Sequence, residues 1–178
     1  MKKIYFVRHG QSQANADGLA SGSEFDTPLT EKGIEQAKKT GLELKGRGID
    51  LIVCSPISRA VDTAQIIAEQ IGYNPDKIIK SDYFTERNFG IYSGKTNEEY
   101  LSAVHSGSLH ASVEPAEKMS QRVAKGLKWL ESLQGQDVLI VSHGGVSRIL
   151  RLMHQDLPLS HMYKLDKQDN ASIYEFDL

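Results

Sequence analysis

The sequence has very little of several features that define whole classes of protein. Cys54 is the only cysteine among 178 residues, so no intrachain disulfide can form, and we expect a reducing, cytoplasmic setting. No apolar run is long enough to cross a bilayer, and the apolar residues before Arg8 are too few for a secretory signal, so no membrane partner is expected. The net charge of −2 argues against a surface that binds nucleic acid.

Two glycine-rich signatures of nucleotide binding are also missing, because Gly144-Gly145 has the spacing of neither a P-loop nor a dinucleotide fingerprint. The composition is otherwise ordinary for a globular protein, with 39% hydrophobic and 25% charged residues. This length suits one full-sized domain and is too short for two large ones. With no linker-like segment in the chain, we expect a single domain over residues 1–178. The sequence leaves the oligomeric state open, a homodimer included.

Three short apolar runs each lead into a polar turn. The runs and their turns are residues 4–7 before Arg8-His9-Gly10, residues 51–53 before Cys54-Ser55-Pro56-Ile57-Ser58-Arg59, and residues 138–141 before Ser142-His143-Gly144-Gly145. Short apolar runs that alternate with helical patterns are typical of parallel strands buried on both faces. The sequence therefore predicts an α/β fold, a three-layer sandwich whose mostly parallel central sheet carries helices on both faces.

The remaining pattern sets the expected boundaries. Strands are expected at residues 3–8, 50–54, 77–80, 137–142 and 172–176, and helices at 30–45, 95–104, 115–133 and 144–154. A further helix is expected to begin at Ser55 as N-cap, with Pro56 at its first position, and to end near Gly72. Residues 84–94 and 104–117 are irregular, and we expect both segments to roof the site.

Four side chains in the polar turns have the chemistry of a phosphoryl-binding site. Ligands of open α/β sheets lie outside the carboxyl ends of the strands, so Arg8, His9, Arg59 and His143 should converge there. Histidine can act as a nucleophile, base or donor near neutral pH, and arginine presents a charged fork to phosphate oxygens. A glycine directly after a strand, such as Gly144, lets the backbone approach a ligand closely. The pattern predicts a site for an anionic substrate.

These turns belong to an ordered series of motifs that resembles the histidine phosphatase superfamily, also called the phosphoglycerate mutase-like family. The blocks are Arg8-His9-Gly10-Gln11-Ser12 with Asn15, Asp26-Thr27-Pro28-Leu29-Thr30 with Gly33, Ser55-Pro56-Ile57-Ser58-Arg59-Ala60, Glu86-Arg87-Asn88-Phe89-Gly90, and Ser142-His143-Gly144-Gly145. One Arg-His-Gly tripeptide is weak evidence, whereas five blocks in the family's order across residues 4–148 are specific. On these blocks the chain is identified as a member of this superfamily, and we favour its phosphatase branch.

The resemblance implies a role for each matching residue. His9 would be the nucleophile that becomes a phosphohistidine, with Arg8 and Arg59 binding the phosphoryl oxygens. His143 would donate to the same group, and Glu86 would protonate the leaving oxygen and later activate water. The expected substrate-binding residues are Asn15, Ser21, Gly22, Arg87 and Gly144. The resemblance implies neither a metal nor a cofactor.

Several activities fit this resemblance, and we favour hydrolysis of a small phosphorylated metabolite. In cofactor-dependent phosphoglycerate mutases, an insertion after the acid block carries arginines that hold a second anionic group. Residues 95–121 of this chain contain no arginine, and Lys95 and Lys118 are their only cations apart from histidines. A mutase is the first alternative, and a phosphohistidine or phosphotyrosine protein phosphatase is another. A non-catalytic phospho-ligand binding module is disfavoured, because both His9 and Glu86 are present.

Overall fold

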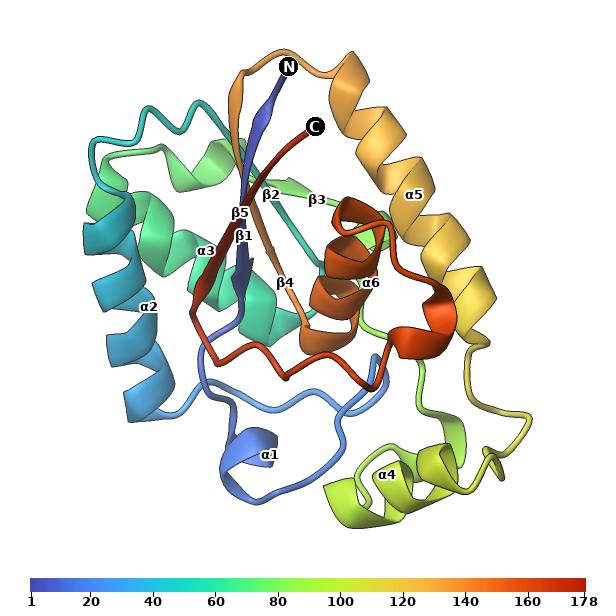
Figure 1. Ribbon diagram of the computed structural model, residues 1–178. Helices are drawn as coiled ribbons and strands as arrows, with labels where there is room; N and C mark the ends of the chain where they lie inside the picture. Colours follow the sequence, from blue (N-terminus) through green and yellow to red (C-terminus); the bar gives the residue numbers. More distant parts are fainter.

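The computed structural model describes residues 1–178 and is built around one five-stranded sheet (Figure 1). The strands are β1 (Lys3–Arg8), β2 (Leu51–Cys54), β3 (Ile79–Lys80), β4 (Asp137–Ser142) and β5 (Ile173–Asp177). Their order is β3-β2-β4-β1-β5, in which the first four are parallel and β5 runs antiparallel to β1. The prediction of a mostly parallel central sheet is confirmed.

Helices cover both faces of the sheet. They are α1 (Gln13–Ala16), α2 (Glu31–Leu44), α3 (Ser58–Ile71), α4 (Asn97–His105), α5 (Ala116–Ser132) and α6 (Gly144–His154). Figure 1 shows α2 and α3 on one face and α5 and α6 on the other, while α1 and α4 lie beyond the carboxyl ends of the strands. This arrangement confirms the three-layer sandwich. None of the helices has the length and apolar character that a bilayer-crossing helix needs.

Alternation along the strands explains why the central runs are apolar throughout. Successive strand residues point to opposite faces. Ile4 and Phe6 accordingly belong to the core cluster that contains residues of α5 and α6, whereas Tyr5 and Val7 belong to the cluster that contains residues of α2 and α3. Because both faces of β1 are covered, residues 4–7 are buried on alternating sides and are all hydrophobic.

Local boundaries differ from expectation at two places. The helix expected to start at Ser55-Pro56 begins at Ser58, with Ile57 as its N-cap residue, because the Ser55 hydroxyl contacts His143 and accepts a hydrogen bond from Ile57 N–H. The strand expected over residues 77–80 is reduced to Ile79–Lys80, because a capped 3₁₀ turn, Pro75–Lys77, takes up the residues before it. In contrast, Thr30 caps α2 as predicted, accepting from Gly33 N–H at 3.1 Å.

Candidate active site

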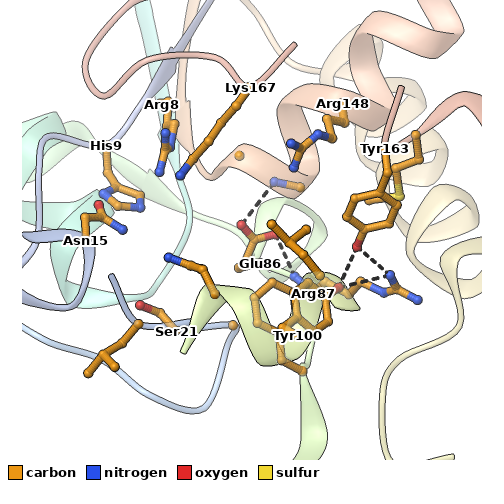
Figure 2. A pocket seen from close by; sticks show the side chains of 18 of the residues that line it. Arg8, His9, Asn15, Ser21, Glu86, Arg87, Tyr100, Arg148, Tyr163 and Lys167 are labelled. Atoms are coloured by element: carbon orange, nitrogen blue, oxygen red, sulfur yellow. Dashed lines mark hydrogen bonds between the residues drawn. The ribbon is translucent and has the colours of Figure 1, made fainter. Parts of the chain in front are cut away.

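The carboxyl ends of β1 and β4 open into one pocket (Figure 2). Nine of the ten predicted site residues line it, namely Arg8, His9, Asn15, Ser21, Gly22, Arg59, Glu86, Arg87 and Gly144. The tenth, His143, is fully buried next to His9, with 5.1 Å between the ring centroids. Residues far apart in the sequence therefore converge where the sequence predicts, while their individual roles remain predictions.

His9 follows the last residue of β1 and is held in one tautomer. Its Nδ1–H donates to the Gly10 carbonyl at 2.7 Å, which leaves Nε2 unprotonated. Arg59 Nε lies 3.2 Å from that Nε2 and donates to it. Burial lowers the pKa of His9 well below its ordinary value, and the neighbouring Arg59 and Arg8 charges lower it further. His9 is thus a neutral imidazole at neutral pH, with Nε2 available for attack.

The chain after His9 is held by unusually close backbone packing. A Cβ on Gly33 would lie 2.8 Å from Gln11 N and 2.9 Å from the Gln11 carbonyl carbon, so only glycine lets the first turn of α2 approach this loop. From the other side, Asn170 Nδ2 donates to the His9 carbonyl at 2.9 Å and to Asn15 Oδ1 at 3.0 Å. These contacts fix the backbone of His9, and the Asn15 amide nitrogen has no protein acceptor.

His143 follows the last residue of β4 and is the N-cap residue of α6, and one of its ring nitrogens has no protein partner. Its Nε2 lies 2.8 Å from Ser55 Oγ, whereas its Nδ1 is buried without any partner. Burial, Arg59 and His9 together lower the pKa of His143 well below its usual value, so the ring is neutral. Ser55 Oγ already accepts from Ile57 N–H, so its hydroxyl proton is left to donate to His143 Nε2, and the single ring proton then lies on Nδ1. That N–H can donate to an oxygen of a bound anion.

Two buried arginines supply fixed positive charge. Arg59 is 1% exposed, and its guanidinium also binds Asp26 Oδ1 at 3.0 Å and the Gly22 carbonyl at 2.8 Å. Arg8 donates to the Gln168 carbonyl at 2.7 Å, while its Nε is buried without a partner. Burial lowers the pKa of Arg8 to about 10, which still leaves it charged at neutral pH. An anion at this point would meet a preformed pair of guanidinium groups.

Glu86 reaches the same pocket from the segment after β3 and is nearly buried. Its Oε1 accepts from Arg87 N–H at 2.9 Å and its Oε2 from Gly145 N–H at 3.1 Å. The first turn of α6 therefore holds the carboxylate. A Cβ on Gly145 would overlap Oε1 and lie 3.2 Å from Glu86 Cδ, so this position of the carboxylate depends on glycine.

Arg87 lies beside Glu86, but protein groups hold its side chain. Its guanidinium donates to the Glu114 carbonyl at 2.7 Å and to the hydroxyls of Tyr100 and Tyr163 at 3.2 and 2.8 Å (Figure 2). Phe89 stacks on Tyr100 with 4.1 Å between ring centroids. Arg87 thus ties α4 to the segment before β5, and its predicted contact with substrate stays a prediction.

The roof of the pocket differs in part from expectation. Residues 84–94 contribute Glu86, Arg87 and Phe89, as predicted, but residues 104–117 line none of the pocket. Their place is taken by α4, through Asn97, Tyr100 and Leu101, and by residues 162–167. The 104–117 segment acts from behind, where the Glu114 carbonyl holds Arg87.

Sequence reasoning missed several residues that line or support the site. Arg148 and Lys167 add two cations to the pocket, Tyr163 adds a hydroxyl, and Ser55 contacts His143. Arg148 could have been found, because it follows Gly144 by four residues and so shares its helix face. Residues 155–172 carry no periodicity that would have pointed to Tyr163 or Lys167.

Comparisons with known proteins agree with this geometry. The model of the histidine phosphatase superfamily (branch 1) matches residues 4–178. The adenosylcobalamin/alpha-ribazole phosphatase of Escherichia coli is 33% identical over 172 residues, 90% of this chain and 83% of the relative. A 2,3-bisphosphoglycerate-dependent phosphoglycerate mutase of Parvibaculum lavamentivorans is 30% identical over 190 residues, 98% and 90% of the two chains. The solved structure of Bacillus stearothermophilus YhfR superposes with a TM-score of 0.88 at 25% identity, covering 100% of this chain and 92% of that one.

Proposed function

The chain belongs to the histidine phosphatase superfamily, and we propose that it hydrolyses the phosphomonoester of a small metabolite through a phosphohistidine at His9. The observation that carries the proposal is the state of His9. It is a buried, neutral imidazole with Nδ1–H committed to Gly10 and Nε2 facing Arg59. A nucleophile with its lone pair beside two guanidinium groups suits attack on an anionic phosphorus centre.

In the first step, Arg8, Arg59 and the Nδ1–H of His143 bind the phosphoryl oxygens. His9 Nε2 forms a bond to phosphorus while the ester P–O bond breaks, and the Glu86 carboxyl group donates its proton to the departing alkoxide oxygen. In the second step, water attacks phosphorus, the Glu86 carboxylate takes a proton from that water, and the P–N bond breaks. Inorganic phosphate leaves and neutral His9 is regenerated. The arginines neutralise the developing charge, so the proposed reaction uses no metal.

The pocket's size and charge support a small anionic substrate. Its cavity of about 170 Å³ is close to the ~150 Å³ that an engineered protein cavity uses to hold benzene. Five of its lining side chains are cationic, Arg8, Arg59, Arg87, Arg148 and Lys167, and one, Glu86, is a carboxylate. A phosphorylated metabolite of a few carbons suits a space of this size.

Phosphoglycerate mutase activity is the second candidate, favoured by the relatives that carry that name. The residues of α4 that line the pocket, Asn97, Tyr100 and Leu101, are all neutral. A bisphosphorylated intermediate would therefore find no cation on this wall while it turned between two orientations. We expect water to reach the phosphohistidine first.

The test is hydrolysis of para-nitrophenyl phosphate between pH 5 and 8 in excess EDTA. Wild type should turn over, His9→Ala should not, and His154→Ala, an exposed histidine at the end of α6, should match wild type. Equal activity in wild type and His9→Ala would contradict the proposal. Conversion of 3- to 2-phosphoglycerate that depends on 2,3-bisphosphoglycerate and exceeds hydrolysis would favour the mutase.

A further inference from the structure

One arginine of α5 holds the segment that carries Glu86 from outside the pocket. Arg122 does not line the substrate pocket. Its Nη1 donates to the backbone carbonyls of Tyr83 and Thr85 at 3.0 and 2.8 Å. Its Nε and Nη2 donate to the carboxylate of Glu114, with 3.0 Å between Nη2 and Oε2. A single side chain therefore ties the turn before Glu86 to the segment before α5.

Glu114 in turn holds the residues that follow Glu86. Its backbone N–H donates to the Asn88 carbonyl at 2.9 Å, and its Oε2 accepts from Asn88 N–H at 3.3 Å. Its carbonyl accepts from Arg87 Nε at 2.7 Å. The backbone is thus held just before Glu86 by Arg122 and just after it by Glu114, and the ion pair joins the two points of attachment.

The position of Glu86 depends on such contacts because no regular structure fixes it. Residues 85–89 belong to no helix or strand. The Glu86 carboxylate itself is held by the backbone N–H groups of Arg87 and Gly145. A general acid must meet the leaving oxygen within hydrogen-bond reach, and a misplacement of about 1 Å can cost about 10²-fold in rate. Any movement of this segment would therefore reach the chemistry directly.

The ion pair is suited to hold backbone in place. The Arg122 and Glu114 side chains are only 21% and 11% exposed, so solvent screens their attraction far less than that of a surface pair. The planar guanidinium binds a carboxylate with one edge while another nitrogen reaches the carbonyls, which the single ammonium of lysine cannot do. Loss of either partner would leave the other as a mostly buried, unpaired charge.

We propose that Arg122 and Glu114 are positioning residues for the general acid, which together hold the Glu86 carboxyl group against the leaving oxygen of the substrate. Neither residue touches the substrate pocket. This inference rests on the proposed hydrolase function and assigns two further residues to it.

The kinetic test compares two substrates that differ in their need for an acid. Benzyl phosphate must leave as an alcohol, whereas para-nitrophenyl phosphate releases a stable phenolate without protonation. The ratio kcat/KM covers only the steps up to release of that group. Arg122→Met should lower kcat/KM for benzyl phosphate by about tenfold to a hundredfold and for para-nitrophenyl phosphate by less than about threefold. Glu86→Gln should show the same selectivity, and Lys125→Met, an exposed cation of the same helix, should match wild type.

Two further variants separate position from charge and from folding. Arg122→Lys keeps the charge but cannot bridge the carboxylate and the carbonyls, so it should show the same selective loss as Arg122→Met. Full activity of Arg122→Lys would mean that charge alone matters and would overturn the proposal. Glu114→Gln keeps the shape of its side chain and should show a smaller loss of the same selectivity, which tests the proposal even if Arg122→Met does not fold. An equal loss for both substrates in folded variants would overturn it as well.

Amide hydrogen exchange distinguishes failure of this inference from failure of the proposed function. Gly145 lies in the first turn of α6, where N–H groups have no acceptor within the helix, so its protection depends on Glu86. In Arg122→Met, the Arg87 and Gly145 amides should exchange about tenfold faster, and that of Ile140 in β4 at the wild-type rate. Faster exchange without para-nitrophenyl phosphate turnover in wild type would keep the positioning role and refute the hydrolase. Turnover that His9→Ala abolishes, with the same exchange rates in both proteins, would refute the positioning role alone.

Discussion

The first turn of α6 offers a direct perturbation of the proposed acid. Gly144 and Gly145 are adjacent, and neither has a positive φ, so alanine is compatible with the backbone at both positions. At Gly145, an added Cβ would overlap Glu86 Oε1 and lie 3.1 Å from Met119 Cε, which leaves the methyl no free space. At Gly144, the same methyl would meet Arg8 Nε at 3.5 Å, an ordinary van der Waals contact.

Gly145→Ala must therefore move the Glu86 carboxylate by about 1 Å, a misplacement that can cost about 10²-fold in rate. The same change weakens the hydrogen bond from Gly145 N–H to Glu86 Oε2. General acid catalysis typically contributes about 10²- to 10⁴-fold, so we expect kcat/KM toward an alkyl phosphate to fall about 10²-fold, or about 2.7 kcal/mol in the barrier. Gly144→Ala should lose far less, about threefold.

The assay is release of inorganic phosphate from an alkyl phosphate, with thermal unfolding measured in parallel to show that each variant is folded. A double-mutant cycle isolates the mechanism. Glu86→Ala removes the oxygen that the new methyl meets, so Gly145→Ala should cost little further activity in that background. Full activity of Gly145→Ala, or an equal loss with and without Glu86, would refute the reasoning.

Three further predictions concern the buried groups around the site. Ser55→Ala should lower kcat about tenfold with little change in KM, because His143 loses the partner of its Nε2. Ser58→Ala, which changes an exposed serine, should leave kcat unchanged. Equal kcat values for the two variants would contradict this role of Ser55. His9 and His143 stay neutral in the fold but gain protons in the unfolded chain below pH ~6.5, so the free energy of unfolding should fall with decreasing pH by about 1.4 kcal/mol per unit for each. Urea titrations between pH 6.5 and 5 should show that the free energy of unfolding of His143→Asn changes less steeply with pH than that of wild type. The same slope in both proteins would count against a buried, neutral His143 ring. Burial raises the pKa of the Cys54 thiol to about 11. A disulfide reagent at pH 8 should therefore label Cys54 only when the protein unfolds. Fast labelling of the folded protein would contradict the burial of this thiol.

Much of this site could be predicted because its residues directly follow strands. The apolar run before Arg8 identified β1 as a strand covered on both faces, and the carboxyl-end rule then placed His9 and His143 together. Arg59 could be placed for the same reason, although its helix begins at Ser58 rather than Ser55. Ser55 was misassigned because a serine before proline is a good helix cap, and nothing local in the sequence reveals its contact with His143.

The other side of the pocket depends on non-local pairing. β5 runs antiparallel to β1, with Ile173 opposite Val7, so residues before β5 must lie at the carboxyl edge of the sheet. That geometry brings Tyr163 and Lys167 to the site, yet it follows only once the direction of the last strand is known. The short, irregular stretch before β5 carries no periodic signal. The prediction that residues 104–117 form part of the roof of the pocket was wrong, because this stretch lies there instead.

The central claim is a covalent phosphate on His9 Nε2. Glu86→Gln, which should slow attack of water on the intermediate, can be mixed with para-nitrophenyl phosphate, quenched in alkali within one turnover and digested for mass spectrometry. We predict one phosphate on the peptide that contains His9, stable in alkali, lost in acid and absent from His9→Ala. Nitrophenol release with no phosphate on the protein, or phosphate on His143 instead, would contradict the account.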